Sequence, residues 1–249
     1  MNKAEVRITI RFFGSLVDLV GDRYVKIDAG INQTIKDCIE RLGVPHTEVY
    51  FITLRKDFVR FDRIVENGDT YFVYPECNLD IPKEYVLTPK YAGVPKFILD
   101  IHLGKLARLL RMLGISAEYG IVEDEMIVQK AVSENLIILT RDRGMLKKSE
   151  VVYGYVVRSD KPEEQLREVT LRYGLQRWFR PFTRCMECNG ELISVSKSVI
   201  LDQLPEKVKE NYDEFAKCSK CGKVYWGGTH YENMNTFIEK FLENLSKGK

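Results

Sequence analysis

The chain has 249 residues, 45% of them hydrophobic and 30% charged, and its 38 Lys and Arg nearly balance its 36 Asp and Glu. The apolar fraction excludes wholesale disorder, and the near-neutral charge excludes a histone-like polycation. Six Cys are too few for a disulfide-dense scaffold of this length.

The expected cellular setting follows from the N-terminus and the hydropathy. Polar and charged residues interrupt positions 1–13, so we expect no signal peptide. A run of about 18 apolar residues, which a membrane helix requires, does not occur. We therefore expect a cytoplasmic protein without membrane contact, whose Cys are reduced or metal-bound.

The first 80 residues predict strands around one helix. Apolar and polar residues alternate over 6–12, the period of a half-buried strand. Thr34 begins a helix, with Asp37 at the capping-box spacing and Gly43 as its stop. The predicted strands are 6–12, 24–27, 49–54, 59–61 and 70–74.

This order of two strands, a helix and further strands resembles the ubiquitin-like β-grasp fold. Ubiquitin and the sulfur carriers of this fold need a free Gly-Gly C-terminus. Residues 75–80, where the domain would end, contain no Gly-Gly and continue into further chain. A conjugating or sulfur-carrying role is therefore disfavoured, and docking on a protein partner is the better hypothesis.

A proline-rich run follows this domain. Pro75, Pro82, Pro89 and Pro95 fall within 21 residues, which excludes a regular helix or a central strand. The run predicts a linker over 81–95.

Residues 96–180 alternate short strands with helices. This α/β pattern predicts a parallel sheet with helices on both faces. The helices are expected to begin after Asp100, at Asp124 and at Pro162. The expected strands are 96–100, 119–122, 136–139 and 151–157.

Three acids follow strands of this predicted sheet. Asp100 ends the first strand, and Asp124 and Asp142 lie just past the second and third. Ligands bind outside the carboxyl ends of parallel strands, so we expect these side chains at one rim. Converging carboxylates repel one another unless a cation lies between them, and Mg²⁺ and Mn²⁺ prefer oxygen ligands. The sequence therefore predicts a catalytic Mg²⁺ or Mn²⁺ site suited to phosphodiester hydrolysis.

Basic residues surround these acids. Residues 96–180 carry 15 Lys and Arg against 12 Asp and Glu. A nuclease needs cations for the phosphate backbone beside its carboxylates. The candidate RNA-phosphate contacts are Lys105, Arg108, Arg111, Arg141 and Arg143.

Each of these features also has a structural explanation. Asp124 stands where a helix favours an N-cap, and Asp142 stands in a plausible turn. The Lys and Arg stripe after Asp100 fits a solvated helix face. His102 and Asp160 are weaker candidates for assisting residues.

The last 69 residues contain two Cys-x2-Cys pairs. Four thiolates suit tetrahedral Zn²⁺ and leave no open coordination position, so the expected zinc is structural. Residues 189–190 (Asn-Gly) and Gly222 suit the tight turns that follow each pair. The aromatic run at 225–231 is of a kind that stacks on RNA bases, and more often covers a small zinc core. The predicted ligands are Cys185, Cys188, Cys218 and Cys221.

Four motifs together carry a family resemblance. They are Lys96–Asp100, the helical run from Asp100 to Gly114, Thr140-Arg-Asp-Arg143, and the Cys pairs with the run that ends at His230. With these motifs the chain resembles the PIN-like Mut-seven C-terminal RNase family. Some prokaryotic members of that family carry a ubiquitin-like N-terminal domain, which residues 1–80 resemble.

The resemblance implies a PIN-like RNase domain over 96–180 and a zinc ribbon with a C-terminal helix over 181–249. It implies RNA as the substrate and Asp100, Asp124 and Asp142 as the acidic site. We therefore expect a metal-dependent ribonuclease, with one structural Zn²⁺ in a ribbon that helps to bind RNA. The alternative is a non-catalytic RNA- or ribosome-binding adaptor. A PIN-type toxin fits less well, because such toxins are usually single small domains.

Overall fold

The structure is a computed structural model that describes residues 6–247. The chain forms two compact units. Unit 1 contains residues 6–93, 98–102 and 121–158. Unit 2 contains residues 94–97, 103–120 and 159–247. The division therefore passes through the segment 96–180.

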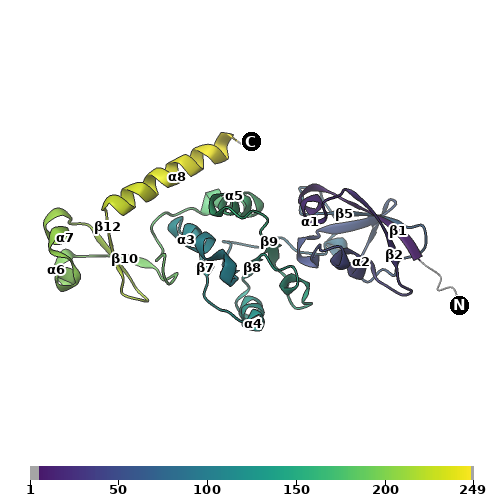
Figure 1. The fold of residues 1–249 in the computed structure, drawn as a ribbon, viewed down its shortest axis with the longest axis horizontal. Helices are drawn as coiled ribbons and strands as arrows, with labels where there is room; N and C mark the ends of the chain where they lie inside the picture. Colours follow the sequence, from purple (N-terminus) through teal and green to yellow (C-terminus); the bar gives the residue numbers. More distant parts are fainter. Residues whose placement is uncertain (1–5, 248–249) are drawn as a thin grey trace. The chain divides into compact units, whose positions relative to one another are not determined.

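Unit 1 begins with a five-stranded sheet and one main helix (Figure 1). The strand order is β2-β1-β5-β3-β4, in which β1 pairs antiparallel with β2 and parallel with β5. This arrangement confirms the predicted β-grasp fold. Its elements are β1 (Val6–Phe12), α1 (Val17–Val20), β2 (Tyr24–Ala29), α2 (Ile35–Arg41), β3 (Phe51–Leu54), β4 (Asp57–Val59) and β5 (Thr70–Tyr74).

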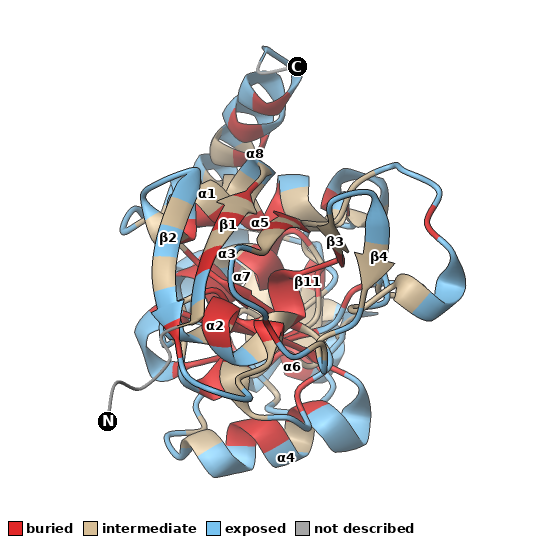
Figure 2. Ribbon diagram, turned by 90° about the vertical axis from the view of Figure 1, so that its right-hand side faces the viewer, coloured by how far each residue is buried: buried red, intermediate tan, exposed pale blue. Residues whose placement is uncertain are grey.

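The alternation of apolar and polar residues over 6–12 determines which side chains of β1 enter the core of this domain. Ile8, Ile10 and Phe12 are at most 1% exposed and pack in one cluster with Ile35 and Ile39 of α2. Figure 2 shows that the edge strand β2 is largely exposed or half-buried, in contrast to the buried positions of β1. Period-two patterning therefore directs one face of the sheet to α2.

Helix α2 begins with the predicted capping box. The Asp37 backbone N–H donates to Thr34 Oγ1 at 3.2 Å, and the Thr34 N–H donates to Asp37 Oδ2 at 3.0 Å. The hydrogen bonds from the Thr34 backbone and hydroxyl lower the pKa of Asp37. After the helix, Gly43 has φ of +87°, a conformation that favours glycine.

The proline-rich segment lies on the β-grasp domain. Ile81 is buried in a cluster with Tyr50 and Phe51. The Leu87 N–H donates to the Tyr50 carbonyl at 2.8 Å, and Thr88 Oγ1 donates to the His46 carbonyl at 2.8 Å. This segment of the predicted linker is therefore anchored on unit 1.

The second sheet has the strand order β7-β6-β8-β9, and β8 pairs parallel with β9. All residues of β6 and β8 are buried, as expected for strands covered on both faces. The predicted parallel sheet with helices is confirmed. Its strands are β6 (Phe97–Leu99), β7 (Ala117–Glu118), β8 (Ile137–Thr140) and β9 (Gly154–Val156), and α4 (Asp124–Glu134) precedes β8.

The strand predicted at 119–122 is wrong in position. The Ser116 carbonyl accepts from the Phe97 N–H at 2.9 Å, so the pairing occurs earlier and β7 has only two residues. Gly120, with φ of +106°, then ends the extended conformation. Val122 is 69% exposed and does not enter the sheet.

Within unit 1, the β-grasp domain is docked on the segment 121–158. Apolar residues of both belong to one buried cluster. Glu48 is 2% exposed; the Val156 N–H donates to its Oε1 at 2.8 Å, and the Arg158 guanidinium pairs with its Oε2. Nε2 of His46 lies 2.9 Å from the Val151 carbonyl. A face of the β-grasp domain is thus used by its own chain.

Glu48→Ala is expected to lower the free energy of unfolding of unit 1 by about 3 kcal/mol, because it removes the carboxylate partner of the half-buried Arg158 and leaves the buried Val156 N–H without its acceptor. Urea unfolding measures this loss. Glu66→Ala is the matched control, because Glu66 pairs with Arg63 on the surface, and it should cost at most about 1 kcal/mol. Equal losses in both variants would show that the buried pair does not hold the domains together.

Unit 2 contains helices α3 and α5, a three-stranded ribbon and a long C-terminal helix. The ribbon has the order β10-β11-β12, antiparallel throughout. Among residues 6–247, helices long and apolar enough to cross a membrane are absent. The elements are α3 (Gly104–Met112), α5 (Pro162–Tyr173), β10 (Leu192–Val195), α6 (Lys197–Ile200), α7 (Glu206–Asn211), β11 (Phe215–Cys218), β12 (Val224–Trp226) and α8 (Thr229–Lys247).

Candidate functional site

Asp100, directly after β6, is the buried centre of a hydrogen-bond network in unit 1. It is 5% exposed. Its Oδ1 accepts from the His102 N–H at 2.8 Å, and its Oδ2 accepts from the Arg141 N–H at 2.9 Å and from the Thr140 hydroxyl. These bonds join the ends of β6 and β8. A carboxylate has about four acceptor positions, so Oδ1 keeps one position for a further partner.

Thr140 connects Asp100 to Asp142. It is fully buried, and its Oγ1 donates to Asp100 and accepts from the Asp142 N–H at 2.8 Å. The Asp142 side chain is exposed, and its Oδ1 accepts from the Gly144 N–H at 2.7 Å, in the predicted turn. Sequence reasoning assigned no role to Thr140. The available signal is a hydroxyl residue that closes an otherwise apolar strand.

Asp124 is half-buried and is the first residue of α4. It adds to the raised pKa of Lys148, for which the main cause is the hydrogen bond to Glu125. Among residues 6–247, the four Cys form the one group of three or more candidate metal ligands, and their sulfur atoms all lie within 4.8 Å of one another. The three acids do not form such a group, and hydrogen bonds through Thr140 link Asp100 to Asp142.

The basic residues of unit 1 occupy two environments. Arg141 is exposed beside Asp142. Arg143 is half-buried, and its Nη1 donates to the Leu19 carbonyl of the β-grasp domain at 2.9 Å. Arg143 therefore has a docking contact, whereas Arg141 stays at the surface next to the acids.

The basic residues of α3 are also dissimilar. Lys105 is exposed, and Arg108 pairs with Glu187 at 2.8 Å. Arg111 is 3% exposed, and its burial lowers its pKa. Its guanidinium donates to the Ala117, Met186 and Glu187 carbonyls at 2.8–3.0 Å. The structure does not support the predicted phosphate contact for Arg111, which holds the first Cys pair on α3 instead.

The four predicted zinc ligands lie together in unit 2. The Sγ atoms of Cys185 and Cys221 are 3.7 Å apart, and those of Cys188 and Cys218 are 3.4 Å apart. With Zn–S bonds of about 2.3 Å, a tetrahedral site needs sulfur separations of about 3.8 Å. The donor set therefore fits one Zn²⁺ with all four positions filled.

The surroundings of Cys185 and Cys218 lower the pKa of these thiols, whereas burial raises the pKa of Cys188. Burial raises the pKa of Cys185, but hydrogen bonds from the Tyr225 hydroxyl and nearby backbone N–H groups outweigh it and lower the pKa to about 6. The Cys221 N–H also donates to Cys218 Sγ at 3.4 Å. At Gly190, a Cβ atom would lie 2.8 Å from Cys218 Sγ, so the turn needs glycine. This confirms the sequence reading of the turn.

Asn189 fastens the first Cys pair to strand β7. It is 6% exposed; its Oδ1 accepts from the Ala117 N–H at 3.0 Å, and its Nδ2 donates to Ser116 Oγ and Glu118 Oε1. Together with Arg111, it joins the ribbon to the α/β part of unit 2. The sequence indicated a turn at Asn189 but not this anchoring role.

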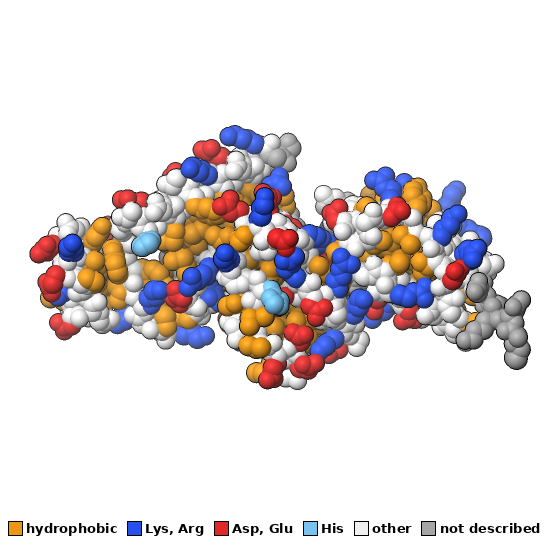
Figure 3. Space-filling view, in the orientation of Figure 1, with side chains coloured by type: hydrophobic (Ala, Val, Ile, Leu, Met, Phe, Trp, Pro, Cys, Tyr) orange, Lys and Arg blue, Asp and Glu red, His pale blue; other side chains and the backbone are white. Residues whose placement is uncertain are grey.

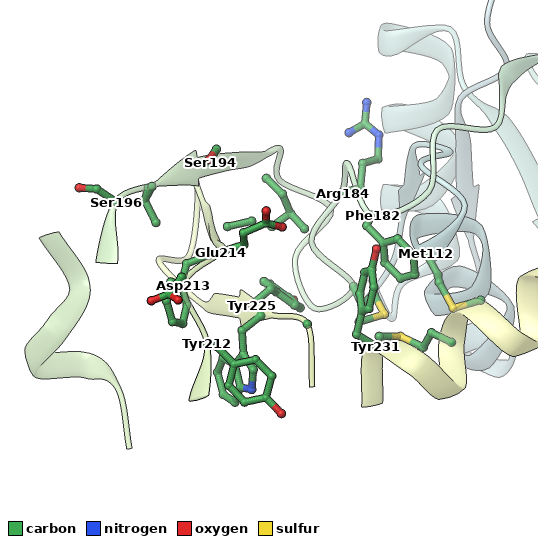
Figure 4. A pocket seen from close by; sticks show the side chains of 18 of the residues that line it. Met112, Phe182, Arg184, Ser194, Ser196, Tyr212, Asp213, Glu214, Tyr225 and Tyr231 are labelled. Carbon is green, nitrogen blue, oxygen red and sulfur yellow. The ribbon is translucent and has the colours of Figure 1, made fainter. Parts of the chain in front are cut away.

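A groove of about 1100 Å³ runs along the ribbon (Figure 4). Tyr212, Tyr225 and Tyr231 line it, and Asp213 and Glu214 lie on the same surface. The aromatic rings suit stacking, but the two carboxylates oppose a phosphate backbone.

Comparison of the sequence with known protein families gives two matches along the chain. The sequence matches the Mut7-C RNAse domain over residues 95–238 and the Mut7-C ubiquitin domain over residues 5–79. The comparison with curated proteins gives no match.

Solved structures align with the β-grasp part. A candidate subunit 1 of molybdopterin converting factor from Pyrococcus furiosus is 19% identical, covering 29% of this chain and 99% of that chain, with a TM-score of 0.25. Small archaeal modifier protein 1 from Haloferax volcanii is 15% identical, with the same coverages and a TM-score of 0.26.

The match to the Mut7-C RNAse domain, over residues 95–238, spans more than half of the chain. The chain therefore belongs to the Mut7-C RNAse domain family and carries the Mut7-C ubiquitin domain N-terminal to it.

Proposed function

We propose that this protein is a metal-dependent ribonuclease that hydrolyses phosphodiester bonds of RNA. The observation that carries the proposal is the hydrogen-bonded set of Asp100, Thr140 and Asp142 at the ends of β6 and β8, within a domain of an RNase family. Parallel strands present ligand-binding groups at this end.

Asp100 and Asp142 are the residues that would hold Mg²⁺ or Mn²⁺, with Asp124 as a third candidate. Their donor set is all oxygen, which fits these ions. When bound, the ion supplies an activated water and stabilises the leaving oxygen. Thr140 orients Asp100 by donating to its carboxylate, and it fixes the backbone of Asp142. Lys105 and Arg141, both exposed, hold RNA phosphates.

We propose that the four Cys hold a structural Zn²⁺. Four thiolates leave no position for water or substrate. The contribution of the ribbon to function is therefore to build an RNA-binding surface on unit 2.

The test is cleavage of 5′-labelled single-stranded RNA by the purified full chain with Mn²⁺, with Mg²⁺ and with no added divalent ion. We expect cleavage with Mn²⁺ or Mg²⁺ only, and none of a DNA strand of the same sequence. Absence of RNA cleavage under every divalent ion would contradict the ribonuclease proposal.

One observation favours a second candidate, a non-catalytic RNA- or ribosome-binding adaptor. Three of the acceptor positions of Asp100 are filled by the protein itself, as in a purely structural network. The adaptor predicts salt-sensitive RNA binding without cleavage. Calorimetric titration with Mn²⁺ separates the two, because the adaptor binds no ion at Asp100 and Asp142.

A further inference from the structure

A pocket of about 570 Å³ opens in unit 2 where α3, the first Cys pair and α8 meet. Its size is within the usual range of ligand sites, about 300–1000 Å³. One side is charged, with Arg108, Glu187 and Lys223, and the other is apolar, with Met186, Met234 and Phe237.

Two cations from different elements converge on one carboxylate at this pocket. Arg108 Nη2 lies 3.0 and 2.8 Å from the two oxygens of Glu187, and Lys223 Nζ lies 2.9 Å from Oε1. All three side chains are solvent-accessible, with exposures of 61%, 42% and 48% for Arg108, Glu187 and Lys223. Surface pairs of this kind contribute little to stability, so Glu187 is a replaceable partner.

A phosphate is the natural alternative partner for these cations. Arg binds carboxylate and phosphate oxygens through the same donors, and Lys binds either as a point charge. Glu187 therefore occupies the place where one RNA phosphate would lie between α3 and β12.

The apolar side of the pocket suits a base. Phe237 is half-buried on α8 and follows Met234 by one turn, so both line the same face of the helix. Figure 3 shows hydrophobic side chains exposed beside α8, with Lys and Arg next to them. Stacking on an aromatic ring tolerates any base, as a binder of single strands needs.

We propose that this pocket binds one nucleotide of single-stranded RNA, with its phosphate between Arg108 and Lys223 in place of Glu187 and its base against Phe237. The inference rests on the proposed RNA substrate. All residues of this site belong to unit 2, and Glu187 acts as a competitor that weakens RNA binding.

The first experiment removes the competitor. Binding of a fluorescent 12-nucleotide oligo(U) is measured by anisotropy, in the Asp142→Asn background and without added divalent ions, so that cleavage does not interfere. Glu187→Gln is expected to tighten binding about five- to tenfold. Glu239→Gln is the matched control, because Glu239 lies two residues from Phe237 and so points to the opposite side of α8; it should leave the affinity unchanged.

The second experiment removes the cations and the ring. The double variant Arg108→Ala/Lys223→Ala should weaken binding and reduce the slope of log affinity against log salt by about 0.7, since both cations hold one phosphate and each phosphate contact to a single strand contributes about 0.7. Phe237→Ala should weaken binding at least about fivefold with the salt slope unchanged. Lys161→Ala, an exposed cation of unit 2 outside the pocket, is the control.

One zinc per chain in each variant shows that the ribbon is intact. Unchanged affinity in Glu187→Gln and in the double cation variant would overturn the site, whatever the cleavage assay gives. If the wild-type chain fails to cleave RNA but these variants shift the affinity as stated, the site stands and the ribonuclease proposal fails.

Discussion

Asp142→Asn is expected to reduce Mn²⁺-dependent RNA cleavage by about 10²- to 10³-fold, the effect of removing one preorganised electrostatic partner of a transition state. The Asp142 carboxylate is exposed and its backbone is tied to Thr140, so the charge can be removed without loss of buried contacts. Initial rates on labelled RNA, at saturating Mn²⁺, measure the change.

The control is Asp57→Asn, an exposed acid of β4, which should leave the rate unchanged. Thermal unfolding should give the same midpoint for Asp142→Asn and Asp57→Asn.

Asp100→Asn is a different experiment. An amide NH₂ there faces the His102 N–H at one oxygen position, or the Thr140 hydroxyl and the Arg141 N–H at the other, so it should lower stability as well as rate. Wild-type cleavage by Asp142→Asn would remove Asp142 from the proposed site.

Local patterns were enough to predict most of the fold. The strand at Val6–Phe12 has the predicted bounds and helix α5 begins at the predicted Pro162, because alternation and a proline at the first helical position act within a few residues. The strand near 117–122 was misplaced, because its position depends on the partner Phe97, about twenty residues away. Strand pairing depends on two segments that are distant in the sequence, whereas hydrophobic periodicity can be recognised within one segment.

In the candidate sites, too, features set by local sequence could be predicted and features that depend on distant partners could not. The cluster of four Cys was predictable because Cys-x2-Cys places two thiols on one turn, and the separation between the two pairs does not matter. Thr140, Glu48 and Asn189 were missed, because each is defined by polar partners brought together by the fold. Arg111 was misread for the reverse reason. Its helical spacing matched a basic stripe, while its position beside three carbonyls made it a structural residue.

Removal of zinc is expected to unfold the ribbon and leave unit 1 folded. The ribbon has a small core of its own, in which Ile200, Leu204, Val208 and Phe215 are buried, and zinc binding contributes about 10–16 kcal/mol in comparable small domains. Chelation, or Cys218→Ser, should abolish the bound zinc and expose amides that the ribbon protects, such as the Cys218 N–H, which donates to the Lys223 carbonyl at 2.9 Å.

Hydrogen exchange followed by mass spectrometry measures amide protection in both units in one experiment. Peptides from β10–β12 should lose protection after zinc removal, whereas peptides from β8 should keep it, because β8 lies in the core of unit 1. Cys77→Ser is the control, since Cys77 is outside the four-sulfur group and should retain one zinc per chain. Ribbon peptides that stay protected without zinc would show that Arg111 and Asn189, rather than the metal, hold the ribbon in its fold.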